Sequence, residues 1–345
     1  MQFSRLFPIS FLLFITTCVS AQTPTFDDPV SYLNYIGEGY EQIAQDQWQY
    51  MSAVAHGKSA KKVEKRRTEV LESNRTASQK VMKMPGYMGN EILRDSVIAF
   101  LNLSYHVLNE DFEKILNLDE IKEQSYDNME AYLLAQEEAS KKLEAAGVNM
   151  DKAKDKFCAE NDINLGETKS PLEEKMEKAG EAFGYYNKVY LIFFKSYKQE
   201  MYLLDAIERS DVNAIEQNRN AIQQYAGEDK LKLKELGGFK SDVTLQIACR
   251  KLLDFYENEG KVEMKTILDF FLKTDEFQKI KTAFENKREK DRTQSDFDKY
   301  NESANEANKA GAKYNATNEK LFENRSRLIN EWNSKMAEFL DRHVP

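Results

Sequence analysis

The stretch YYNKVYLIFFKSYKQEMYLLDAI, from Tyr185 to Ile207, combines a run of aromatic residues with regularly placed charges. The charged residues break it into apolar pieces that are all too short to cross a membrane. Its apolar side chains recur on one broad helical stripe: Tyr186, Val189, Tyr190, Phe193, Phe194 and Tyr197. This spacing predicts the central helix of a helical bundle, rather than a membrane-inserting helix or the wall of a ligand pocket.

The same helical spacing recurs on both sides of this stretch, while alternation of apolar and polar residues is nearly absent. The chain of 345 residues contains only 14 glycines and 6 prolines. We therefore predict an all-α fold of long antiparallel helices that form one or two helical bundles.

Capping residues and glycines predict where these helices begin and end. Predicted starts lie at Asp28-Pro29, Ser59, Gly89-Asn90, Asp119 or Ser125, Ser170-Pro171 and Asp211. Further junctions are expected at Gly57, Met84-Pro85-Gly86, Gly237-Gly238, Gly260 and Thr274-Asp275. From about residue 275 to 342 we expect two long helices with a break near Gly311.

When the sequence is shifted by 152 residues, the predicted helix starts and junctions of the first half align with those of the second half. The matched positions include Tyr50 with Tyr202, Ser59 with Asp211, Met84 with Leu236, Gly86-Tyr87 with Gly238-Phe239, and Leu93 with Leu245. Any two amphipathic helices can be aligned so that their apolar positions match, so those matches alone are weak evidence. The capping residues and glycines, however, also align at the same shift. This favours a tandem duplication of a four-helix unit, with units at 28–165 and 166–345.

The first 21 residues have the pattern of a secretory signal peptide, with Arg5, an apolar core and small residues before Gln22. Residues 22–27 would then form a short N-terminal extension, and the protein would be exported to the periplasm, cell surface or extracellular space. The minority alternative is lipid attachment at Cys18, for which Thr17 is an unfavourable preceding residue. Cys158 and Cys249 would remain, and we expect at most one optional disulfide between them.

The net charge of −9 argues against a nucleic-acid partner. The stretch SAKKVEKRR, residues 59–67, is the basic exception. On a helix, one side carries the basic stripe, defined as Lys58, Lys61, Lys62, Lys65 and Arg66. It is either a solvated helix face or a surface for an anionic partner such as lipopolysaccharide or phospholipid headgroups.

The sequence predicts no catalytic centre, metal site or cofactor. Its three histidines lack the Glu-x-x-His pairs of a di-iron bundle, and Gly37-Glu38-Gly39 lies within a helical pattern. The acidic residues are expected on solvated faces, where no acid–base pair can be identified.

Two segments carry a resemblance to a family: YLNYIGEGYEQIAQDQWQYMSAVAHGKSAKKVEKRR, residues 32–67, and LSYHVLNEDFEKILNLDEIKEQSYDNMEAYLLAQE, residues 103–137. Over about residues 28–165 the chain resembles an uncharacterised helical surface-protein family of spirochaetes and Bacteroidota. The resemblance implies an envelope or surface location and an all-helical fold, and it transfers no catalytic residues.

These observations predict a non-catalytic exported envelope or surface protein that acts as a scaffold or binding module. Its partner would be an envelope protein, a glycan or an anionic lipid headgroup. The alternatives are a membrane-active, toxin-like helical bundle and, far less favoured by the residues, an enzyme.

Overall fold

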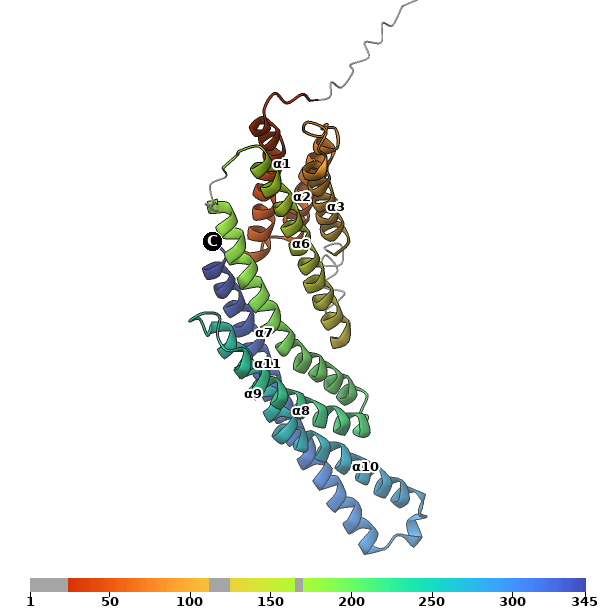
Figure 1. Cartoon of the computed structure of the whole chain (residues 1–345). Coiled ribbons are helices and arrows are strands. Elements are labelled where there is room, and N and C mark those ends of the chain that lie inside the picture. The colour runs from red at the N-terminus through yellow and green to blue at the C-terminus, as the bar shows by residue number, and fades with distance from the viewer. Residues whose placement is uncertain (1–23, 112–124, 165–169) are drawn as a thin grey trace, which may run out of the picture.

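The computed structural model describes residues 24–111, 125–164 and 170–345, and within these ranges the fold is all-α without strands. The predicted leader, Cys18, Asp119 and most of the linker around Gly166 lie outside the described residues. The helices form two bundles that follow one another along an elongated molecule (Figure 1).

Among its described residues, the first bundle contains four α-helices and one π-helical turn. These are α1 (Pro29–Ala55), α2 (Ala60–Met82), α3 (Ile92–His106), the turn η1 (Val107–Asp111) and α6 (Tyr126–Glu160). Their buried core includes Tyr32, Ile36, Val97, Leu101 and Phe157.

The second bundle begins after the linker and continues to the C-terminus. Its elements are α7 (Pro171–Glu208), α8 (Val212–Leu236), α9 (Thr244–Asn258), the π-helical turn η2 (Glu259–Glu263), α10 (Met264–Asn286), the short 3-10 helix η3 (Glu289–Asp291) and α11 (Gln294–His343). The far ends of α10 and α11 project from the bundle as a two-helix hairpin (Figure 1). An aromatic seam joins the two helices, with Phe270 on Tyr314 at 4.5 Å and Phe284 on Tyr300 at 5.0 Å between ring centroids.

The capping predictions are largely confirmed. Asp28 accepts hydrogen bonds from the first amides of α1, Ser125 and Asp211 cap α6 and α8, and Ser170 forms a capping box with Glu173. Ser59 stands at the start of α2 as expected, but its side chain makes no capping hydrogen bond.

Two predicted breaks are wrong. Gly260 does lie at a junction, in η2 between α9 and α10, whereas Thr274-Asp275 lies inside α10. Gly311 lies inside α11, which is one helix of 50 residues rather than two. The actual break falls at Lys287–Thr293, where a capping box between Thr293 and Asp296 starts α11. A glycine in a helix costs only about 1 kcal/mol, so flanking residues with good helix propensity carry the helix through it.

The predicted central role of the aromatic stretch on α7 is confirmed. One face of α7 packs into the second core through Val189, Phe193 and other apolar residues. The other face carries Phe194, which packs with Met129 of α6 and joins the two bundles. The end of α1 also reaches the second core, because Ala55 is buried there and Trp48 packs against it.

Several local features recur in both bundles at the predicted spacing of 152 residues. The π-turns lie at Val107–Asp111 and Glu259–Glu263, and isolated backbone bridges join Tyr87 to Asn90 and Phe239 to Asp242. Helices α1 and α7 instead correspond with a shift of 153, because the loop after α7 is one residue shorter. The expected match of Tyr50 with Tyr202 is therefore off by one, since Tyr202 is exposed and Leu203 is the buried residue.

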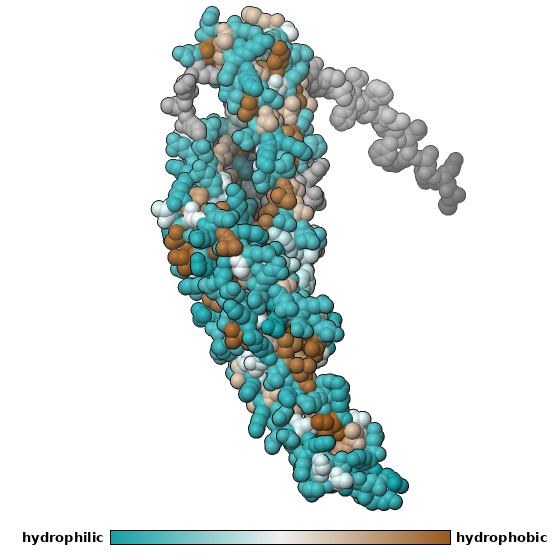
Figure 2. All heavy atoms as spheres, turned by 60° about the horizontal axis from the view of Figure 1, so that its bottom comes forward, coloured by the Kyte–Doolittle hydropathy of each residue, from teal (hydrophilic) through white to brown (hydrophobic). Residues whose placement is uncertain are grey.

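The outer surface is mainly hydrophilic. On the face in Figure 2, hydrophobic side chains form separate small groups rather than one continuous patch. Among the described residues, no helix is long and apolar enough to cross a membrane.

Candidate functional site

The basic stripe lies where α1 turns into α2. Lys58, Lys61, Lys62 and Lys65 are exposed, while Arg66 is partly buried. On the opposite side of α2, Val70 is fully buried and Val63 packs beside it in a small core with Tyr50. Helix α2 therefore has a basic face and an apolar face, and Ala60 at its first position is exposed.

Ion pairs divide the stripe into two parts. Arg66 contacts Glu69 at 2.7 Å, and Lys65 lies 3.7 Å from the same carboxylate. These cations hold the pKa of Glu69 below its ordinary value, mainly through the hydrogen bond from Arg66. Within the described part of the chain, no carboxylate lies within ion-pair distance of Lys58, Lys61 or Lys62.

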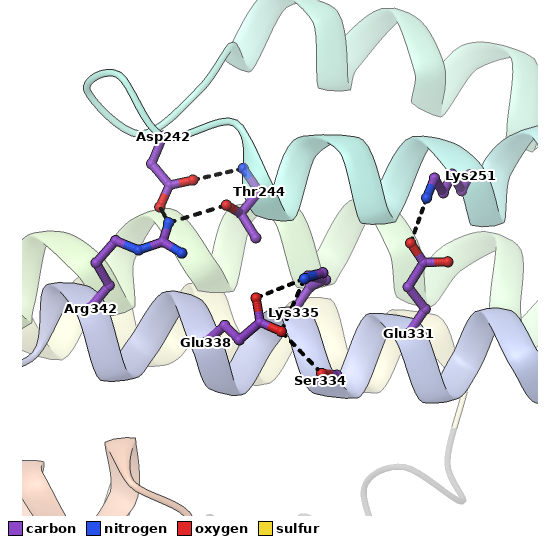
Figure 3. Close-up of polar contacts among 8 residues, drawn as sticks. All are labelled: Asp242, Thr244, Lys251, Glu331, Ser334, Lys335, Glu338 and Arg342. Atoms are coloured by element: carbon purple, nitrogen blue, oxygen red, sulfur yellow. Dashed lines mark hydrogen bonds and ion pairs between the residues drawn. The ribbon is translucent and has the colours of Figure 1, made fainter.

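Elsewhere on the surface, cations are commonly paired across helices. Lys251 of α9 contacts Glu331 of α11 at 2.5 Å, whereas Lys335 and Glu338 pair at 2.7 Å within α11 (Figure 3). Arg342 near the C-terminus binds Asp242, which also accepts a hydrogen bond from the Thr244 amide (Figure 3). The lysines at the start of α2 differ from these cross-helix pairs.

A polar groove of about 590 Å³ runs between α1 and α2 and limits the stripe on one side. Four carboxylates line it, namely Glu38, Asp46, Glu69 and Glu72. Arg66 also faces this groove, so the positive surface is confined to the lysines at the turn and the first two turns of α2.

The position of the lysines opposes the electrostatics of the helix. The N-terminal end of a helix carries a partial positive charge, so cations there are unfavourable by about 0.3–1 kcal/mol each. Lys61 and Lys62 lie in the first turn of α2, which contains no acidic residue. Ser59 makes no side-chain capping bond, and its carbonyl accepts hydrogen bonds from the Lys62 and Val63 amides, so the Ala60 and Lys61 amides remain available together with the lysine ammonium groups. An anion placed here would meet both.

The corresponding end of α8 is built differently. Asp211 accepts a hydrogen bond from the Ala214 amide and thereby caps α8 with a negative side chain. Asn213 and Ala214 occupy the places of Lys61 and Lys62. The contrast shows that this type of helix end does not require lysines.

The two cysteines in the described part of the chain are free and buried in different bundles, Cys158 on α6 and Cys249 on α9. The optional disulfide is therefore absent. Burial raises the pKa of both thiols, which keeps them protonated and unreactive.

The expectation that acidic residues lie on solvated faces is wrong at Asp229 of α8, which is fully buried and accepts a hydrogen bond from Ser196, and at two further positions. Glu200 of α7 and Glu259 of η2 are fully buried and share Arg325 of α11. Because Glu200, Glu259 and Arg325 are far apart in the sequence, sequence analysis did not predict that they pair. The one local signal is that Glu200 lies at the end of the aromatic stretch, at a position that faces the core. Among the described residues, no cluster of three or more His, Cys, Asp or Glu side chains could hold a metal ion.

Comparison with known proteins adds no relative, because no family model, curated protein or solved structure matches this chain.

Proposed function

We propose that the protein is a non-catalytic, exported helical binding protein whose first bundle docks onto an anionic lipid surface through the basic stripe. The observation that supports this proposal is the exposed lysine group at the start of α2, where the helix makes cations unfavourable. The phosphate groups of a lipid surface would turn this cost into a favourable interaction.

The export part of the proposal rests on the leader pattern of residues 1–21. The absence of a catalytic role is proposed from the sequence, in which the histidines and cysteines are few and far apart. An elongated form with one localised basic surface suits a protein that bridges a membrane surface and a second component.

We also infer that the two bundles arose from duplication of one four-helix unit. The shared π-turns, backbone bridges and capping positions support this, as do two equivalent tyrosine hydrogen bonds. Tyr32 donates to the Pro85 carbonyl and Tyr185 donates to the Gly237 carbonyl. On this reading, the first unit acquired the basic stripe and the second acquired the long hairpin.

The docking proposal is tested with sedimentation of phosphatidylglycerol vesicles. We expect the wild-type protein to co-sediment at low salt and to dissociate as the salt concentration rises, because exposed charges are screened. Each lysine near an anionic membrane contributes about 1 kcal/mol, so Lys61→Gln, Lys62→Gln and Lys65→Gln together should weaken partitioning by about 100-fold.

The matched control replaces three exposed lysines of α11, Lys299, Lys309 and Lys313, with Gln. It changes the net charge equally but lies far along the chain from the stripe, so it should bind nearly as the wild type does. Equal weakening of both variants, or undiminished binding of the stripe variant, contradicts the proposal. Circular dichroism confirms that each variant is folded.

A further inference from the structure

A buried ionic cluster lies where α7, α9, η2 and α11 meet in the second bundle. The Nε atom of Arg325 donates to Glu200 Oε1 at 2.5 Å, and a terminal nitrogen of Arg325 donates to Glu259 Oε1 at 2.8 Å. Both glutamates have no exposed surface, and the Arg325 side chain is only 17% exposed. One guanidinium therefore bridges two carboxyl groups in the interior.

Three oxygen atoms of the cluster are buried without a hydrogen bond of ordinary geometry: Glu200 Oε2, Glu259 Oε2 and the Tyr256 hydroxyl. Both Tyr256 and Glu259 nevertheless lie close enough to Glu200 to affect its pKa. Buried polar atoms are nearly always satisfied, so these three require an explanation. Two ionised glutamates beside one arginine would also leave a net negative charge in the core.

The surroundings supply no second cation to balance that charge. Tyr256 of α9 lies beside the cluster, and burial together with the charges of Glu200 and Glu259 raises the pKa of its hydroxyl. Arg219 of α8 lies near but donates to the Gly260 carbonyl at 2.9 Å. Among the described residues, Arg325 is the one cation that pairs with either Glu200 or Glu259.

One bound proton would both supply a hydrogen-bond donor to the buried oxygen atoms and cancel the net negative charge. If one carboxyl is protonated, its hydroxyl can donate to the other carboxylate, and the cluster with Arg325 becomes neutral. Burial raises the pKa of Glu259, and the adjacent negative charge of Glu200 raises it further. Burial also raises the pKa of Glu200, but the positive charge of Arg325 opposes that shift. Arg325 opposes the shift at Glu259 as well, so the proton belongs to the pair of carboxyl groups rather than to one of them.

The position of Glu259 connects this proton to the hairpin. Glu259 is the first residue of η2, the π-turn through which α9 continues into α10. The next residue, Gly260, is pressed against α8, since an added Cβ would come within 3.0 Å of the Arg219 carbonyl oxygen. At this residue the turn therefore packs closely against α8. Lys320 of α11 and Glu263 pair at 2.7 Å on the outer side of the same turn.

We propose that Glu200 and Glu259 hold one proton between them in the folded protein, and that this proton keeps the base of the α10–α11 hairpin closed. Deprotonation would leave two buried anions on one guanidinium at the first residue of η2. The cluster of Glu200, Glu259 and Arg325 then makes the stability of the hairpin base depend on pH, and this property is independent of the basic stripe.

The direction of the pH effect follows from the raised pKa. At a pH below the ordinary glutamate pKa, both the folded and the unfolded chain carry the proton, and the hairpin base has its full stability. As the pH rises from that value through the raised pKa of the folded state, the stability contributed by the proton is lost. The hairpin base should therefore loosen with increasing pH.

Hydrogen exchange of the amides in residues 259–267 and 321–329, corrected for the intrinsic pH dependence of exchange, tests this proposal. In the wild type, protection should fall as the pH rises. In Glu259→Gln, the amide group donates permanently to Glu200 in place of the proton, so protection should stay constant. The exposed Glu323→Gln on α11 is the matched control and should behave as the wild type does.

A second measurement detects the proton directly. The infrared spectrum of the wild type at neutral pH should contain a protonated carboxyl band that is missing from folded Glu259→Gln and retained in Glu323→Gln. Glu200→Gln should also fold, because Glu259 can then ionise against Arg325, whereas the double variant leaves Arg325 unpaired and should be far less stable. Identical pH profiles and identical carboxyl bands in wild type and Glu259→Gln would overturn the proposal.

Discussion

Gly260 and Gly311 show how the same residue type serves different purposes in two helical segments. At Gly260 an added Cβ would lie 2.9 Å from Ile222 Cγ2 and 3.0 Å from the Arg219 carbonyl oxygen. At Gly311 it would meet the Phe270 ring at 3.6 Å, an ordinary contact distance. Of these two positions, close packing requires glycine at Gly260 and not at Gly311.

The substitution Gly311→Ala should raise the free energy of unfolding by about 0.5–1 kcal/mol, because alanine loses less backbone entropy in a helix. Gly260→Ala should instead lower it, since the methyl group has no space between η2 and α8. Urea denaturation of the two variants compares them directly. Destabilisation by Gly311→Ala would mean that the packing between α10 and α11 is tighter than the structure shows.

The residues that the sequence did not reveal are those whose environment depends on distant parts of the chain. Glu200, Glu259 and Arg325 lie on three separate elements, and neither spacing nor composition brings them together. The basic stripe, by contrast, could be predicted, because all five residues lie within nine positions of one another.

Helix α7 joins the two bundles because its aromatic residues face in two directions. Phe193 stacks on Trp332 of α11 with ring centroids 5.0 Å apart, inside the second core. Phe194, the next residue, is buried against α6 with Met129. A helix with apolar residues on only one face could build either the core or the junction, but not both.

Phe194→Ala should separate the unfolding of the two bundles. Removing a buried phenylalanine costs about 3–5 kcal/mol, and at this position much of the loss falls on the contact between bundles. Calorimetry of the variant should then resolve two unfolding transitions, one for each bundle, whereas in the wild type the two bundles should unfold closer together in temperature. Phe193→Ala is the matched control and should lower the transition of the second bundle. A single, uniformly lowered transition in Phe194→Ala would mean that the bundles do not depend on this contact for their coupling.

Helix starts could be predicted because capping is a local property. Asp28, Ser125, Ser170 and Asp211 each accept bonds from amides two or three residues ahead. The π-turns could not be predicted in the same way. They depend on tertiary contacts, such as the hydrogen bonds that Arg67 and Arg219 donate to the Leu108 and Gly260 carbonyls.

The basic stripe and the α10–α11 hairpin lie far apart in the molecule. The basic stripe lies at the turn between α1 and α2, near the C-terminal end of α11, where His56 contacts Asp341 at 2.6 Å. The α10–α11 hairpin projects from the opposite end of the second bundle (Figure 1). A surface that holds the stripe would therefore leave the hairpin free to contact another component.

The end-to-end arrangement of the bundles was left open by the sequence, which allowed either one bundle or two. Amphipathic spacing shows that a helix has a buried face, but it does not show which helix covers that face. The second apolar face of α7, and the contact of Trp48 with the second core, decide the arrangement and become apparent only in three dimensions.

The central claim is that docking uses the turn between α1 and α2, and not its counterpart between α7 and α8. Hydrogen exchange of the protein bound to phosphatidylglycerol vesicles tests it most directly, because it compares both turns in the same molecule. We predict added protection in residues 56–66, where lysines and uncapped amides meet the lipid phosphates, and no change in residues 209–219. Protection confined to another part of the molecule, or shared equally by the two turns, would contradict the claim.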